Sequence, residues 1–142
     1  MPNDPHDLAR FVDAQDPVIA QVRAEMAAGE KQTHWMWFVF PQIAGLGSTP
    51  MAQRYAVASL DEARAYLDHP VLGARLRDLT ALVIAVEGRT AHQIFGSPDD
   101  LKFRSSMTLF GQAAPAEPLF REALAKYYAG QPDPRTLELL DR

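Results

Sequence analysis

The sequence predicts an all-α fold, a single compact domain of about seven to nine short helices that covers residues 1–142. Three observations lead to this prediction. Proline follows a helix-capping residue at five places, apolar residues recur at intervals of three and four, and no Asn-Gly or Asp-Gly pair marks a β-hairpin. A length of 142 residues also fits one domain of ordinary size.

Helix starts are predicted where a capping side chain precedes a proline. An Asp, Ser or Thr side chain accepts hydrogen bonds from the free N–H groups of the first turn, and a proline at the next position has no N–H that needs a partner. The five pairs are Asp4-Pro5, Asp16-Pro17, Thr49-Pro50, Ser97-Pro98 and Asp133-Pro134. A sixth start is predicted at Ser59, because Ser59 and Glu62 have the spacing of a capping box.

Apolar residues between these starts have helical spacing. The longest stripe predicts one buried helix face from Leu72, Leu76, Leu79, Val83 and Val86. Shorter stripes lie within residues 18–26, 120–127 and 137–140. Four glycines follow apolar runs and are predicted to end helices in the left-handed conformation: Gly29, Gly88, Gly96 and Gly130.

Residues 34–40 are apolar on both faces and fit either a buried strand or a buried helix. Thr33 as a cap and Pro41 as a terminator favour a short helix. Residues 42–50 and 113–118 are predicted to be surface loops.

The composition narrows the class of function. A net charge of −4 and a pI near 5.5 argue against non-specific nucleic-acid binding, which needs a basic excess. The lack of cysteine excludes disulfides, iron–sulfur clusters and thiol catalysis. We expect a cytoplasmic protein with no membrane partner. No apolar run approaches the roughly 20 residues that a membrane-spanning helix needs, and no signal peptide is visible. No metal or cofactor is predicted, since the four histidines lack metal-site spacing.

The segment at residues 31–42 is the first of two places where chemistry is concentrated. Lys31 could neutralise a phosphate, His34 could act as an acid or base, and Trp37 could stack on a base or sugar. Gln42 could bind a ligand at the mouth of the following loop, or cap the turn. The alternative is structural, because a run of Trp, Phe, Met and Val is typical of a core.

The segment at residues 99–110 is the second, and a helix is predicted there. Helical spacing places Phe103, Met107 and Phe110 on the core side, with Lys102, Ser106 and Leu109 on one flank and Arg104 on the other. Ser105, Thr108 and Gln112 are predicted to lie away from Phe103. Lys102 or Arg104 could bind an anion with help from Ser105 and Ser106, and Lys102 could activate Ser106 as a nucleophile. Alternatively, both cations pair with Asp99 and Asp100, and the hydroxyls bond back to helix carbonyls.

Three strings in these regions are HWMWFVFPQ (34–42), GLGS (45–48) and KFRSSMTLF (102–110). They resemble the hallmarks of the bacterial and fungal domain-of-unknown-function family 1810. The resemblance runs from Leu8 to Leu140 and includes Tyr55, the Glu62-Ala63 pair and the stretch from Tyr66 to Leu72. It implies a mainly α-helical fold, and it implies no established activity, cofactor or catalytic residue.

Three hypotheses for the function follow. The first is a protein that binds an anionic small molecule, a nucleotide or a sugar phosphate, in a pocket formed by the 31–42 and 99–110 segments. The second is a non-catalytic interaction module, such as a homodimer. The third is a glycosidase-type enzyme acting on a nucleotide-sugar, with His34 as its acid or base. Whether the protein is an enzyme stays open at this stage. The candidate ligand-binding residues are Lys31, His34, Trp37, Gln42, Lys102, Arg104, Ser105 and Ser106.

Overall fold

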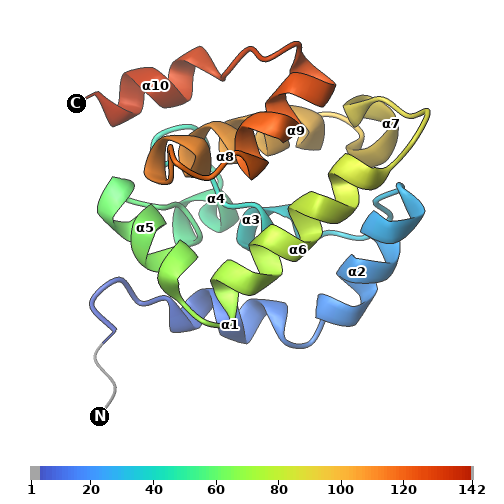
Figure 1. The fold of residues 1–142 in the computed structure, drawn as a ribbon. Helices are drawn as coiled ribbons and strands as arrows, with labels where there is room; N and C mark the ends of the chain where they lie inside the picture. Colours follow the sequence, from blue (N-terminus) through green and yellow to red (C-terminus); the bar gives the residue numbers. More distant parts are fainter. Residues whose placement is uncertain (1–3, 142) are drawn as a thin grey trace.

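Helices follow one another along residues 4–141, the part of the chain that the computed structural model describes (Figure 1). They are α1 (Ala9–Gln15), α2 (Ile19–Ala28), α3 (Met36–Val39), α4 (Pro50–Arg54), α5 (Leu60–Asp68), α6 (Leu72–Ala85), α7 (Ala91–Phe95), α8 (Asp99–Ala113), α9 (Leu119–Tyr128) and α10 (Pro134–Leu140). The all-α prediction is confirmed. Within this range the β-structure is limited to one isolated bridge between Ile43 and Val57.

The start of α7 was not predicted, although Gly96 was predicted to end a helix there. The helix begins at a capping box in which the Thr90 side chain accepts from the Gln93 N–H and the Gln93 side chain accepts from the Thr90 N–H. Because α7 has only five residues, it shows no apolar period that could be recognised in the sequence.

Two of the five cap–proline starts lie at the predicted position. Thr49 and Asp133 each accept a hydrogen bond from the third residue of α4 and α10, with proline at the first helical position. Asp4 also caps a helix, but from a distance, because its carboxylate accepts from the N–H groups of Leu8 and Ala9 at the start of α1.

The starts predicted at Asp16 and Ser97 are wrong. Asp16 ends α1, and α2 begins only after Val18. Pro98 rather than Ser97 immediately precedes α8, and no side chain caps that helix. In the segment before α3, Trp35 takes the capping position predicted for Thr33.

The predicted helix ends, and the capping box predicted for Ser59 and Glu62, are partly correct. Gly29 ends α2 and Gly96 ends α7, both with positive φ. Val86 ends α6 in place of Gly88, and Ala129 ends α9 in the left-handed conformation in place of Gly130. At α5, Ser59 caps the helix as predicted. The Glu62 side chain, however, accepts from the Ala58 N–H rather than from Ser59, so the box is incomplete.

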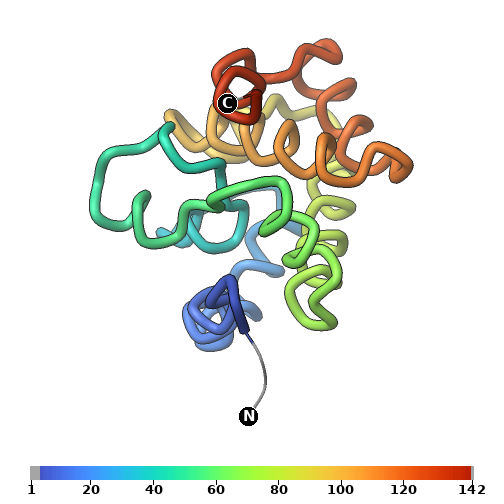
Figure 2. The backbone as a smooth tube through the Cα atoms, turned by 90° about the vertical axis from the view of Figure 1, so that its left-hand side faces the viewer, coloured from blue at the N-terminus to red at the C-terminus, as the bar shows by residue number. Residues whose placement is uncertain are grey.

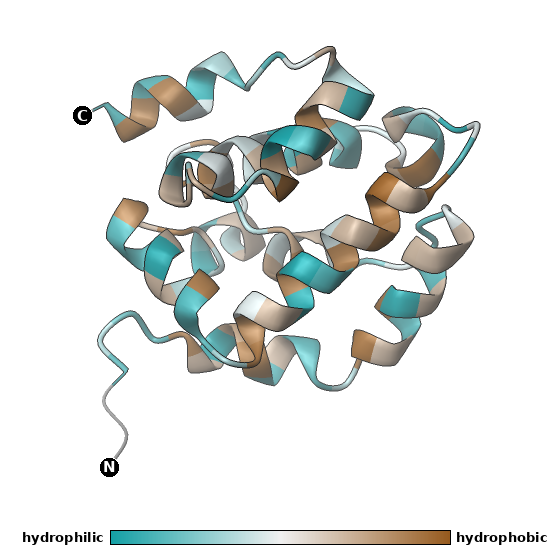
Figure 3. Cartoon of the chain, viewed as in Figure 1, coloured by the Kyte–Doolittle hydropathy of each residue, from teal (hydrophilic) through white to brown (hydrophobic). Residues whose placement is uncertain are grey.

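The core surrounds α8, which packs against α5, α7, α9 and α10 (Figure 1). Phe103, Met107 and Phe110 are fully buried, as their spacing predicts. Phe103 stacks on Phe95 at 4.7 Å between ring centres and meets Phe40 edge-on at 5.0 Å. Hydrophobic and hydrophilic residues alternate along α6 and α10, so each of these helices turns one side to its neighbours (Figure 3). None of the described helices is both long and apolar enough to cross a bilayer.

The chain after α3 leaves the core as a loop that stands out from the helices (Figure 2). The loop starts at Pro41 and is tied down near its base, because Val57 donates its N–H to the Gln42 carbonyl and accepts from the Ala44 N–H. Farther along, Gly45 lies against Leu139 of α10. The loop, α8 and α10 therefore meet at one end of the molecule.

Candidate functional site

A cavity of about 260 Å³ lies where the 42–47 loop, α8 and α10 meet. Gln42, Leu46 and Gly47 line it from the loop, Pro98, Leu101, Lys102 and Ser105 from the start of α8, and Asp133 and Arg135 from the start of α10. Three chain segments that are far apart in sequence thus build one site.

The two cations of this cavity are incompletely neutralised. Lys102 Nζ lies 3.7 Å from Asp99 Oδ1, which is a long contact, and the Lys102 side chain keeps 26% of its surface exposed. Arg135 pairs with Glu138 at 3.2 Å, and both of these side chains are more than half exposed. Solvent screens an exposed pair strongly, so each cation retains the capacity to bind an anion.

The 42–47 loop and the residue after it carry uncharged hydrogen-bond donors near the two cations. The N–H groups of Gly47 and Ser48 donate to no protein acceptor among residues 4–141, and neither does the Gln42 side-chain amide. A side chain at position 47 would not fit, because an added Cβ would lie 2.5 Å from the Ala52 Cβ. Gly47 is therefore packed closely against Ala52 of α4, and it is also one of the residues that line the cavity.

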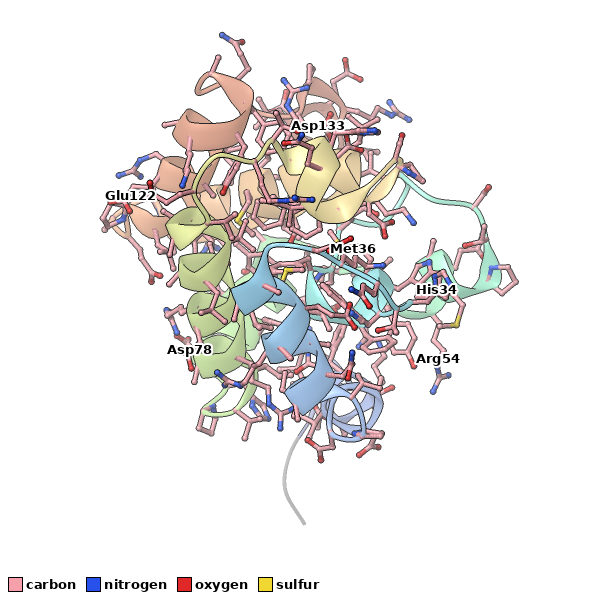
Figure 4. The ribbon with its side chains drawn as sticks, turned by 90° about the vertical axis from the view of Figure 1, so that its right-hand side faces the viewer. His34, Met36, Arg54, Asp78, Glu122 and Asp133 are labelled. Carbon is pink, nitrogen blue, oxygen red and sulfur yellow. The ribbon has the colours of Figure 1, made fainter. Side chains whose placement is uncertain are left out.

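Asp133 fastens α10 to α8 at the edge of the cavity (Figure 4). Its Oδ2 atom accepts from the Ser105 hydroxyl at 2.9 Å, the Thr136 hydroxyl at 2.6 Å and the Thr136 N–H at 3.2 Å. Its own N–H donates to Thr108 Oγ1. Asp133 Oδ1 accepts no hydrogen bond from the described residues.

Three of the predicted ligand-binding residues line this cavity, namely Gln42, Lys102 and Ser105. Two more lie beside it. Lys102 Nζ is 5.5 Å from the centre of the Trp37 ring. The buried Lys31 side chain forms an ion pair with Asp99 at 2.9 Å, so Asp99 lies between Lys31 and Lys102. The 31–42 and 99–110 segments therefore converge.

The remaining three lie elsewhere. His34 is exposed, and Figure 4 shows it well separated from Asp133. Arg104 donates to the carbonyls of Gln131 and Pro132 and thereby holds the chain before α10. The Ser106 hydroxyl is buried without a partner in the described part of the chain, so Lys102 does not activate it.

The environment of α8 differs from the prediction in one further way. Ser105 and Thr108 were expected to lie away from the core, yet both are buried, because α10 covers that side of the helix. Thr108 donates to the Arg104 carbonyl, as the structural alternative predicts, while the single Ser105 hydroxyl proton lies within reach of both the Leu101 carbonyl and Asp133 Oδ2.

The sequence analysis did not single out Arg135, Asp133, Leu46 or Leu101 as site residues. Asp133 carried a visible signal as the cap of the last helix, but only the fold brings it to Ser105. Gly47 belongs to the GLGS string (45–48), which carries the family resemblance but does not by itself mark a ligand site.

Glu25 of α2 holds the chain segment around Lys31 in place through hydrogen bonds. Its buried carboxylate accepts from the N–H and hydroxyl of Thr33, the Gln32 N–H, the Trp35 indole and the Gln21 amide. Burial alone would raise the pKa of Glu25, but these hydrogen bonds outweigh burial and lower the pKa to about 2. The ionised carboxylate holds the segment that carries Lys31.

Three other cavities have no lysine or arginine in their lining. One of about 600 Å³ lies between α1 and α5, with Leu8, Val12 and Ala65 among its lining residues. Two of about 550 and 250 Å³ lie beside α10 and share Leu60 and Leu140. The cavity between α1 and α5 is also lined by His6 and His69 together with Asp4 and Asp13. Among the described residues, no group of three or more His, Asp or Glu side chains is arranged to hold a metal ion.

Comparison with known proteins places this fold. The crystal structure of the conserved hypothetical protein Rv1873 from Mycobacterium tuberculosis, at 1.38 Å, matches 98% of this chain and 99% of its own, with 57% sequence identity and a TM-score of 0.97. No curated protein matches the chain. Residues 5–140 match the family model described as "Protein of unknown function (DUF1810)". Since that match covers nearly the whole sequence, the chain belongs to the DUF1810 family.

Proposed function

We propose that this is a small cytoplasmic protein that binds a phosphate-bearing small molecule, a nucleotide or a sugar phosphate, in the cavity between the 42–47 loop, α8 and α10. One observation carries the proposal. Lys102 and Arg135 approach one cavity from two helices, beside a glycine loop whose Gly47 N–H has no protein acceptor in the described chain.

The balance of charge around the cavity supports an anionic ligand. The whole chain has a net charge of −4, yet two cations and one carboxylate line this cavity. One oxygen of that carboxylate, Asp133 Oδ2, already accepts three protein hydrogen bonds. A phosphate would receive charge-assisted hydrogen bonds from Lys102 and Arg135 and a neutral one from Gly47.

The two other hypotheses have less support. A homodimer needs a contiguous apolar face, whereas the exposed large apolar residues of the described chain are Met51, Val71 and Leu101, which belong to different parts of the fold. A glycosidase that relies on His34 needs this residue at the cavity, but His34 does not line it.

A thermal-shift experiment tests the proposal. The protein is heated in a non-phosphate buffer with inorganic phosphate, AMP or glucose 6-phosphate, at constant ionic strength. A ligand at a hundred times its Kd stabilises the fold by about 2.7 kcal/mol, a shift of several degrees for a chain of this size. We expect at least one phosphate compound to raise the Tm of the wild type, and Lys102→Ala and Arg135→Ala to remove the shift. If no phosphate compound raises the wild-type Tm, the proposal is wrong.

A further inference from the structure

We infer that the ligand is a hydroxylated phosphate ester, such as a sugar phosphate, whose hydroxyl group donates a hydrogen bond to Asp133 while its phosphate binds Lys102 and Arg135. This inference rests on the proposed function and selects one of the two ligand classes named there.

Asp133 has one carboxylate oxygen that accepts no hydrogen bond from the described residues. Asp133 is one of the residues that line the cavity, and its Oδ2 atom is occupied by Ser105 and Thr136. These contacts fix the carboxylate in place and leave Oδ1 without a donor among the described residues. A carboxylate oxygen is the wrong partner for a phosphate, because the two carry like charges. It is a strong acceptor for the hydroxyl group of a neutral ligand body.

The residues that line the cavity offer both hydrogen-bond donors and hydrogen-bond acceptors. Lys102, Arg135 and the Gly47 N–H are donors only, which suits phosphate oxygens. The Gln42 side chain supplies one further acceptor and one further donor group, and neither is used by protein atoms in the described structure. A ligand with a phosphate and several hydroxyl groups matches this combination.

The apolar part of the cavity lining does not favour a nucleobase. It consists of Leu46, Pro98 and Leu101, and no aromatic side chain lines the cavity. Proteins commonly hold a nucleobase by stacking it on an aromatic face. The nearest candidate, Trp37, already has the Lys102 ammonium 5.5 Å from its ring centre. A volume of about 260 Å³ also lies below the roughly 300–1,000 Å³ typical of pockets for drug-sized ligands.

Matched ligands test the inference by isothermal titration calorimetry. Glucose 6-phosphate, ribose 5-phosphate and glycerol 3-phosphate carry hydroxyl groups. Cyclohexyl phosphate has the same charged group on an apolar ring, and AMP carries a nucleobase. We expect at least one hydroxylated ester to bind ten times more tightly than cyclohexyl phosphate, because a site built to accept a hydroxyl discriminates against a ligand that lacks it. We expect the same ester to bind more tightly than AMP, which also carries ribose hydroxyl groups but whose base finds no aromatic side chain in the cavity to stack on.

The Asp133→Asn variant identifies the acceptor. Asparagine caps helices as well as aspartate does, so its amide oxygen can replace Oδ2 towards Thr136 and keep α10 in place. Its amide nitrogen then stands where Oδ1 was, which turns the acceptor into a donor. We expect this variant to lose the tenfold preference for the hydroxylated ester and to bind cyclohexyl phosphate at least as well as the wild type does.

The outcomes separate this inference from the proposed function. Equal wild-type affinity for cyclohexyl phosphate and all the hydroxylated esters overturns the hydroxyl inference, as does tighter binding of AMP, and both leave phosphate binding intact. An undiminished preference in Asp133→Asn also overturns it. If no phosphate compound binds the wild type, the proposed function itself fails. The comparison of ligands on the wild type needs no variant, so it stands even if Asp133→Asn unfolds.

Discussion

The ammonium group of Lys102 lies 5.5 Å from the centre of the Trp37 ring. This contact joins α8 to α3, two helices that are more than sixty positions apart in the sequence. The ammonium group has a second close partner, Asp99, at 3.7 Å. These two contacts together position the charge of Lys102. A cation held over an aromatic face and only loosely paired is positioned for a ligand without being neutralised.

Replacing Lys102 by methionine should therefore separate binding from stability. The methionine side chain still covers Trp37, so we expect the free energy of unfolding to fall by less than about 1 kcal/mol, the value of an exposed cation–π contact. We expect the affinity for inorganic phosphate or a phosphate ester to fall at least tenfold, because one of two cations is lost. Chemical denaturation and calorimetry measure the two effects.

The matched control is Arg23→Met, which changes the net charge by the same amount. Arg23 pairs with Asp78 at 3.3 Å on the surface, and both side chains are largely exposed. We expect wild-type phosphate affinity in this control. Equal losses of affinity in the two variants would show that the net charge, and not the position of Lys102, determines binding.

The fold was predictable because its main signals are local. The Leu72–Val86 stripe, the caps at Thr49 and Asp133 and the apolar face of α8 depend on residues within one or two turns. The failures arose where tertiary contacts decide the local structure. Thr33 resembles a cap but bonds to Glu25, and Asp16 ends a helix while its carboxylate pairs with Arg75.

The site was predictable only in part. Lys102, Gln42 and Ser105 stood out because each lies in an unusual string, and the cavity includes all three. Arg135 did not stand out, since nothing near it in the sequence marks it. It reaches the cavity because Arg104 holds the carbonyls of Gln131 and Pro132, which are long-range contacts that no periodicity encodes.

Substitution by alanine of two adjacent serines of α8 should change the free energy of unfolding in different ways. Ser105 donates to Asp133 and helps to dock α10, so we expect Ser105→Ala to lower the free energy of unfolding by about 1–2 kcal/mol. Ser106 is buried, and its hydroxyl has no partner within residues 4–141. We expect Ser106→Ala to leave stability unchanged or to raise it by up to about 1 kcal/mol, because an unsatisfied polar group is removed.

Chemical denaturation of the two variants measures the difference, and hydrogen exchange locates it. Ser105→Ala should speed amide exchange in α10, while Ser106→Ala should not. A destabilisation of Ser106→Ala as large as that of Ser105→Ala would mean that the Ser106 hydroxyl is satisfied in solution, for example by a buried water molecule.

The carboxylate of Glu25 should make stability fall in acid. Its pKa is about 2 in the folded protein and near 4.5 when unperturbed. In the unfolded chain the Glu25 carboxylate takes up a proton near pH 4.5, whereas in the folded protein it stays ionised down to about pH 2. The stabilisation from Glu25 is fully present above pH 4.5 and is lost as the pH falls towards 2.

Urea denaturation at a series of pH values tests this prediction, with Glu25→Gln as the comparison. Gln cannot accept from Thr33, Gln32 and Trp35 as the carboxylate does, so we expect the variant to be less stable by about 2–4 kcal/mol at neutral pH. The difference between the wild type and Glu25→Gln should shrink between pH 4.5 and pH 2. A constant difference over this range would contradict the assignment of Glu25 as the titrating group.

Gly47 should be needed both for the conformation of the 42–47 loop and for the affinity for phosphate. An alanine Cβ at this position would lie 2.5 Å from the Ala52 Cβ, closer than two such carbons can approach, so the loop must move. We expect Gly47→Ala to lower the free energy of unfolding by about 1–3 kcal/mol. Because the Gly47 N–H is displaced with the loop, the affinity for inorganic phosphate should fall as well.

Gly111→Ala, in the interior of α8, is the matched glycine control. An added Cβ there meets the Phe120 Cβ at 3.8 Å, an ordinary contact, and alanine favours a helix over glycine by about 0.8–1 kcal/mol. This variant should therefore be more stable than the wild type and should bind phosphate with unchanged affinity. If Gly47→Ala instead keeps wild-type phosphate affinity while it loses stability, the loop supports the fold alone, and the ligand is bound by Lys102 and Arg135 without the Gly47 N–H.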